Sequence, residues 1–211
     1  MTAGWQVVAA SAVLSAGPLP PVPGFAHSRF SPLVREAVRG CLGEPGADAL
    51  HGRPGDRTAV VLGTGFGDVT THDLASERLA NGLLPSPLLF YQAVPTAILG
   101  QLCHEYGITG PVTCVSALGD VAESVLPLAA TLVAVEELAQ ALVIGVELAP
   151  SPRTVRVAAG DPRVLLPRTD AAVALLLRPG AGGAAPGGAG AEAFGGLAGL
   201  ARLAEAPEDA R

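Results

Sequence analysis

The chain has 211 residues, of which 49% are hydrophobic and only 15% are charged, and its formal net charge at pH 7 is −6. This length favours a single domain, and an acidic chain without a Lys or Arg cluster argues against nucleic acid and anionic membranes as partners. Three widely spaced cysteines without a Cys-x-x-Cys pair argue against a disulfide framework and a structural zinc site, and no pattern in the chain requires another metal or a cofactor.

The N-terminus carries no basic segment before its first apolar run, so it lacks the features of a signal peptide. A helix that spans a bilayer needs about 20 apolar residues. The longest candidate, 121–141, is interrupted by Glu123, Pro127, Glu136 and Glu137. We therefore expect a soluble, cytoplasmic protein without a membrane partner.

In chain order, the first signals predict a strand, a helix and a second strand. The apolar run Trp5–Leu14 predicts a buried strand. Residues 28–43 place apolar side chains on one face of a helix, and Gly43 suits its C-cap. Residues 57–68, "RTAVVLGTGFGD", predict a second buried strand that runs into a glycine-rich turn.

Two helices and a short strand are predicted next. Residues 71–82 predict a short exposed helix, with Thr71 or Asp73 as its N-cap. The proline-broken stretch "LLPSPLLF" leads into a helix predicted at Tyr91–Tyr106. Residues 110–117, "GPVTCVSA", then predict a third strand.

The remaining elements complete an alternating pattern. Asp120 suits the N-cap of a helix at Val121–Ala139, which is followed by predicted strands at 140–148 and 170–178. Strands that alternate with helices are typical of α/β proteins. The sequence therefore predicts an α/β fold with a five-stranded mixed sheet, and the apolar strands indicate helices on both of its faces.

The composition changes at the end of the fifth predicted strand. Residues 179–211 are rich in Gly, Ala and Pro, which bury too little surface to offset the entropy of ordering them. We therefore predict one domain at 1–178 and a mostly disordered tail at 179–211, with at most a frayed helix in "LAGLARLAEA".

The turn "GTGFGD" has to be weighed as a nucleotide site. The dinucleotide fingerprint needs G-x-G-x-x-G and an acidic residue about 20 residues further on. Here the spacing is Gly63-x-Gly65-x-Gly67, and no second strand with an acidic residue follows. A phosphate-binding P-loop would also need a Lys, so we interpret the stretch as a tight strand-to-loop turn.

Four segments in succession resemble the N-terminal half of β-ketoacyl synthases, the condensing enzymes of the thiolase fold. They are "AVVLGTGFGD", "SPLLFYQAVPTAILGQLCHEYGITGPVT", "ALVIGVEL" and "DAAVALLL". The resemblance covers about residues 5–178 and is closest to short, chain-length-factor-like proteins. It implies a thiolase-like half-domain.

In that family a nucleophilic cysteine follows the third strand, at the N-terminus of a buried helix. Counted without gaps from Gly110-Pro111, this position falls on Gly119, and a slip of one residue gives Leu118 or Asp120. None of these can act as the nucleophile. All four histidines precede the turn, so the catalytic histidines of the family's second half have no counterpart here: His27, His51, His72 and His104. We expect no catalytic residues and no condensing activity from the chain alone.

Other polar residues near this turn have plain structural interpretations. Cys114 lies inside the third strand, where a cysteine is usually a small hydrophobic residue, and Ser116 has no base supplied by a motif. His104 and Glu105 are adjacent, so they point about 100° apart on a helix. Glu147, at the end of the fourth strand, is interpreted as a structural hydrogen-bond acceptor.

The resemblance implies a non-catalytic subunit that lines the far end of a partner's acyl channel, in polyketide or fatty-acid-like biosynthesis on an acyl carrier protein. Its partner would be a full-length ketosynthase or a second copy in a dimer, paired through the edge strand Val112–Ser116. The candidate interface or acyl-channel residues are Phe90, Tyr91, Val94, Ile98, Val112 and Cys114. The helix 121–135 is apolar nearly all round and indicates a second covering layer, which we expect a partner to supply.

Two alternatives remain open at this point. The chain could be a stand-alone acyltransferase or thioesterase-like enzyme that uses Cys114 or Ser116 as its nucleophile. It could also be a scaffold protein that kept the fold without acyl chemistry.

Overall fold

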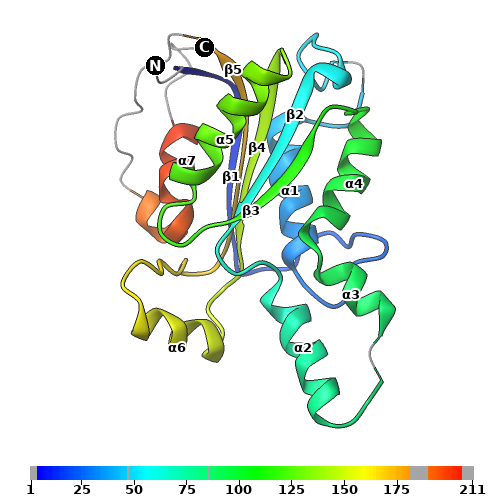
Figure 1. Cartoon of the computed structure of the whole chain (residues 1–211), viewed down its shortest axis with the longest axis vertical. Helices are drawn as coiled ribbons and strands as arrows, with labels where there is room; N and C mark the ends of the chain where they lie inside the picture. Colours follow the sequence, from blue (N-terminus) through cyan, green and yellow to red (C-terminus); the bar gives the residue numbers. More distant parts are fainter. Residues whose placement is uncertain (1–3, 47, 85, 181–189, 206–211) are drawn as a thin grey trace.

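In the computed structural model, residues 4–46, 48–84, 86–180 and 190–205 are described. They form a five-stranded sheet between two helical layers, as expected for an α/β fold (Figure 1). The strands are β1 (Trp5–Ser15), β2 (Thr58–Thr64), β3 (Val112–Ser116), β4 (Gln140–Glu147) and β5 (Asp170–Pro179). The helices are α1 (Phe30–Leu42), α2 (Val69–Ala80), α3 (Pro87–Ala93), α4 (Pro95–Tyr106), α5 (Ala122–Val135), α6 (Pro152–Gly160) and α7 (Ala198–Ala204), with the 3₁₀ turns η1 (Gly55–Arg57) and η2 (Ala191–Leu197).

The sheet is mixed, and its strand order is β1-β5-β4-β2-β3. Strands β2, β3 and β4 are parallel to one another, whereas β5 runs antiparallel to both β4 and β1. Strands β2, β4 and β5 are buried along nearly their whole length because helices cover both faces. Strand β3 is an edge strand, as the sequence predicted for Val112–Ser116.

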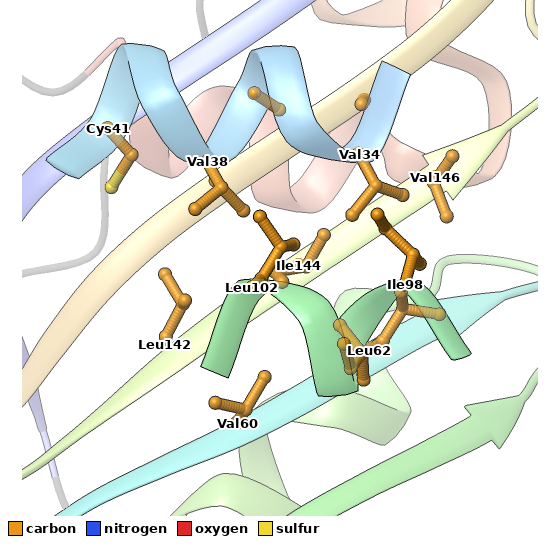
Figure 2. Close-up of a cluster of buried hydrophobic side chains, with 14 of the residues drawn as sticks. Val34, Val38, Cys41, Val60, Leu62, Ile98, Leu102, Leu142, Ile144 and Val146 are labelled. Carbon is orange, nitrogen blue, oxygen red and sulfur yellow. The ribbon is translucent and has the colours of Figure 1, made fainter. Parts of the chain in front are cut away.

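One face of the sheet is covered by α1 and α4. The side chains that meet there come from these helices and from β2 and β4: Val34, Val38, Ile98, Leu102, Val60, Leu62, Leu142, Ile144 and Val146 (Figure 2). Ile98 and Leu62 are fully buried in this cluster. Ile98, which was expected to line a partner interface or an acyl channel, packs between α4 and the sheet of the protomer itself.

The other face is covered by α5 together with η2 and α7, on the left of the sheet in Figure 1. Val125 and Ala129 of α5 are fully buried there, and so are Leu197 and Leu200 from the C-terminal segment. The expected mostly disordered tail is therefore wrong for residues 190–205, because its few Leu and Phe side chains have an apolar sheet face to bury against. Residues 181–189 and 206–211 lie outside the described residues.

Several boundaries differ from the sequence prediction for local reasons. The N-cap of α2 is Asp68 rather than Thr71 or Asp73, because the Asp68 carboxylate accepts the Thr71 N–H at 3.1 Å. The helix predicted at 91–106 is split into α3 and α4, since Pro95 begins a new helix. Gly43 ends α1 with a φ of 75°, as expected of a glycine C-cap.

Helices α2 and α3 extend beyond the lower end of the sheet in Figure 1, and α6 lies on the other side of that end. Across the described ranges, no helix combines the length and apolar character needed to cross a bilayer.

Candidate functional site

The residues that follow the parallel strands β2, β3 and β4 meet at the carboxyl-terminal ends of these strands, where ligands of open α/β sheets commonly bind. They enclose a cavity of about 10 Å³, which is room for a single water molecule. Its lining residues are Gly65, Phe66, Ala117, Leu118, Gly119, Glu147, Val164, Leu165 and Gly196. The cavity lies beside the turn at which the family's nucleophile is expected.

This turn, residues 117–120, connects β3 to α5, and Gly119 occupies its sharpest point. The φ of Gly119 is 83°, a left-handed conformation that glycine adopts without strain. A Cβ added there would have Arg163 O as its nearest neighbour, at 3.8 Å. There is thus space for a side chain, but the backbone conformation favours glycine, and no reactive group stands at this point.

The N–H groups of the first turn of α5 are used within the chain. The Val121 N–H donates to the Gly196 carbonyl at 2.8 Å, and the Ala122 N–H donates to Asp120 Oδ1 at 3.0 Å. The Glu123 N–H donates to the Asp120 carbonyl at 3.1 Å. The N-cap of α5 is Val121 rather than the predicted Asp120, whose carboxylate nevertheless accepts an N–H of the first turn. These three N–H groups are therefore not free to bind an oxyanion at the N-terminus of α5.

Glu147, at the end of β4, is buried and accepts hydrogen bonds from the loop after β2. Its Oε1 accepts the Gly65 N–H and lies 3.4 Å from the Thr64 hydroxyl, which in turn accepts the Gly67 N–H at 2.9 Å. Burial raises the pKa of Glu147 to about 7, although the hydrogen bonds from Gly65 and Thr64 oppose this rise. These bonds give Glu147 a structural task, which is to hold the glycine loop that leads into α2.

The two alternative candidates for a nucleophile, Cys114 and Ser116, lie on β3. Cys114 is half-buried, and burial raises the pKa of its thiol to about 11, so it is a neutral thiol at pH 7. The Ser116 hydroxyl donates to the Gly65 carbonyl at 3.0 Å. Cys41 and Cys103 are buried and free, and burial raises the pKa of each thiol.

His104 and Glu105 do not form a pair. The Glu105 carboxylate accepts a hydrogen bond from Gln101 at 3.0 Å and lies 3.2 Å from the Arg35 guanidinium. Among the described residues, no group of three or more His, Cys, Asp or Glu side chains is arranged to hold a metal ion.

A second region of interest is the surface of α2 and α3. Phe90 is 73% exposed and Tyr91 is 50% exposed, with the Tyr91 ring 5.7 Å from that of Phe25. Phe90 and Val94 line an apolar groove of about 320 Å³ between α2 and α3. The other lining residues are His72, Ala75, Arg78, Leu79, Ser86, Leu89 and Ala93.

The exposed apolar surface of this region is larger than the sequence indicated. Leu79, Leu84 and Leu88 are all more than half exposed. Leu79 lies in the helix predicted to be exposed, whereas the exposure of Leu84 and Leu88 follows from no residue pattern. A second groove, of about 430 Å³, lies between α2 and α6 and is lined in part by Phe66, Leu79 and Val157. The face of α2 that carries His72, Ala75 and Leu79 thus borders both grooves. On the edge strand, Val112 is also exposed.

Comparison with known proteins supports the fold and leaves the function open. No protein-family model matches the chain, and no curated protein matches it either. Among solved structures, it is similar to a ketosynthase in complex with its chain length factor from Xenorhabdus doucetiae, with 22% identity and a TM-score of 0.61 over 79% of this chain and 65% of that one.

Two further structures are similar. The ishigamide ketosynthase/chain length factor is 19% identical, with a TM-score of 0.62 over 83% of this chain and 62% of that one. A β-ketoacyl synthase from Burkholderia phymatum is 15% identical, with a TM-score of 0.61 over 84% of this chain and 59% of that one. The chain thus has the thiolase-like fold expected from its sequence, and it spans less than two thirds of each of these structures.

Proposed function

We propose that this chain is a non-catalytic, chain-length-factor-like subunit that acts with a partner ketosynthase in polyketide or fatty-acid-like biosynthesis. The observation that carries the proposal is the turn after β3, where the gapless count from Gly110-Pro111 assigns the family's nucleophile position to Gly119 and the backbone has the φ of 83° that favours glycine. A subunit without a nucleophile can still contribute to condensation by shaping the space into which a partner's acyl chain grows. The similarity to ketosynthase and chain length factor complexes supports this role.

The partner surface that we assign comprises β3 and the exposed side chains of α2 and α3. The outer edge of β3 carries backbone N–H and C=O groups that are not paired within the sheet, and such an edge readily pairs with another chain. Exposed Phe90, Tyr91 and Leu88 lie on α3, and burying one such side chain contributes about 1.5–3 kcal/mol. A ketosynthase or a second copy of this chain is the partner we propose, and an acyl carrier protein would deliver the growing chain.

The groove between α2 and α3 is the candidate site at which acyl length is limited. Its volume of about 320 Å³ is within the range of roughly 300–1,000 Å³ that small-molecule sites occupy. Phe90 lies at its wall and is mostly exposed, so a smaller side chain there would lengthen the space available to an acyl chain.

The proposal is tested by co-expressing the chain with a ketosynthase encoded beside it and an acyl carrier protein. The chain should co-purify with the ketosynthase, and mass spectrometry should show longer acyl chains on the carrier protein when Phe90→Ala replaces the native chain. Val135→Ala is the matched control, because Val135 is equally exposed but lies at the end of α5. An unchanged product length in Phe90→Ala would contradict the role of the groove.

A second measurement distinguishes the proposed subunit from a stand-alone acyltransferase. The intact mass of the purified chain should not change on incubation with acyl donors. An acyl adduct that disappears in Cys114→Ala or Ser116→Ala would instead show a stand-alone acyltransferase. Co-purification with a ketosynthase without any effect on the product would favour a scaffold.

A further inference from the structure

The C-terminal segment, residues 190–205, lies directly against the turn between β3 and α5. From these contacts we propose that the segment is an intramolecular plug, which occupies the N-terminal end of α5 and keeps that helix end closed to a ligand. This inference rests on contacts within the chain and goes beyond the proposed function, which depends on the missing nucleophile and on a partner.

The backbone of the plug bridges the turn and the loop before β5. Gly196 accepts the Val121 N–H at 2.8 Å and donates its own N–H to the Leu165 carbonyl at 2.9 Å. The Arg168 N–H donates to the Ala193 carbonyl at 3.0 Å. A Cβ added to Gly196 would lie 2.8 Å from the Gly119 carbonyl oxygen, so the two backbones are in close contact. Glycine at this position permits that approach.

Buried side chains hold the plug in place. Leu197 and Leu200 are fully buried against the sheet, and Phe194 is nearly so. Gly145 on β4 makes room for both leucines, because a Cβ added there would lie 2.8 Å from Leu197 Cδ2 and 2.7 Å from Leu200 Cδ1. The segment is therefore anchored in the hydrophobic core, and displacing it would expose large apolar side chains to water.

Asp120 connects the plug to α5. Its carboxylate accepts the Ala122 N–H and packs against Gly199, where any added side chain would collide with the Asp120 oxygens and with Ala122 Cβ. The negative charge stands at the N-terminus of α5, where it is favourable. A ligand oxygen approaching this helix end would have to displace both the Gly196 carbonyl and the Asp120 carboxylate.

The test measures amide hydrogen exchange in the full-length chain. We expect the Val121 amide to be protected in the native protein. Gly199→Leu should act as a wedge against Asp120 and raise the exchange rate of Val121 by at least about tenfold, while the amides of α1 are unchanged. Arg202→Leu, on the exposed side of α7, is the matched control and should leave the Val121 rate as it is. Free exchange of Val121 in the native chain would overturn the proposal, whether or not the wedge variant folds.

This result does not depend on a ketosynthase, so failure of this proposal and failure of the proposed function are distinguishable.

Discussion

Gly63 and Gly145 are direct partners in the pairing of β2 with β4, and both face the helical layer formed by α5, η2 and α7. A Cβ added to Gly63 would collide with Val121, just before α5, and with Val125 of α5, whereas one added to Gly145 would collide with Leu197 and Leu200. This glycine pair lets two segments far apart in the sequence approach the same point of the sheet. It is the reason that the C-terminal segment reaches the turn after β3.

The first prediction concerns this close approach. Gly145→Val should force the two leucines outward and lower the free energy of unfolding by about 1–3 kcal/mol, the usual range for overpacking a core. Urea unfolding measures the change. Gly100→Ala is the control, because no atom lies within 4 Å of a Cβ added there, and in helix α4 this substitution should stabilise the protein by about 0.5–1 kcal/mol. A Gly145→Val variant as stable as the native chain would show that the C-terminal segment does not pack on β4.

The second prediction concerns the C-terminal segment as a whole. Deleting residues 191–211 removes Leu197 and Leu200 from the core, and truncation of a buried leucine alone typically costs about 2–5 kcal/mol. At about 2–4 °C per kcal/mol for a chain of this size, the thermal midpoint should fall by more than about 10 °C. Calorimetry decides the matter, and a midpoint within about 2 °C of the native value would mean that the segment is dispensable.

The third prediction concerns pH. Because burial raises the pKa of Glu147 from 4.5 to about 7, the folded protein binds more protons than the unfolded chain between these two values. The contribution of Glu147 to stability should therefore be complete below pH 4.5 and be lost as the pH rises from 4.5 through 7, by a few kcal/mol at most. In Glu147→Gln this part of the pH dependence should disappear, since the amide cannot ionise.

Urea unfolding at pH 5 and pH 8 measures this difference in both proteins. Glu123→Gln is the control, because Glu123 is an exposed carboxylate in the first turn of α5. If the native chain and Glu147→Gln lost the same stability between the two pH values, the buried carboxylate could not be the cause.

The fourth prediction separates folding from assembly. Ile98→Asp should unfold the protomer, because it places an unpaired charge in the core between α4 and the sheet. Phe90→Asp, on the exposed face of α3, should change the free energy of unfolding by no more than about 0.5 kcal/mol while weakening association with a ketosynthase or a second copy. Thermal melts and sedimentation velocity on both variants check this pair. Association by Phe90→Asp as tight as that of the native chain would exclude α3 from the interface.

The sequence by itself determined the layered architecture and the order of its elements. The apolar run 140–148 predicts a buried strand, and β4 is buried along its whole length because helices cover both faces of the sheet. The run Trp5–Leu14 also forms a strand, but the prediction that it is buried is wrong, because β1 lies at the edge of the sheet and only Ala9 in it is buried. The chain order also placed Gly119 at the turn after β3. These features can be predicted from the sequence because they depend on neighbouring residues and on the period of the hydrophobic pattern.

The tertiary structure alone decided which surfaces are covered. Residues 190–205 have a composition typical of a disordered tail, yet they fold because β4 and β5 offer an apolar face and Gly145 leaves space for Leu197 and Leu200. Likewise, Ile98 and Phe90 are similar apolar residues eight positions apart, and one is fully buried while the other is exposed. Burial depends on what lies opposite each side chain across the fold, and that neighbour belongs to a distant part of the chain.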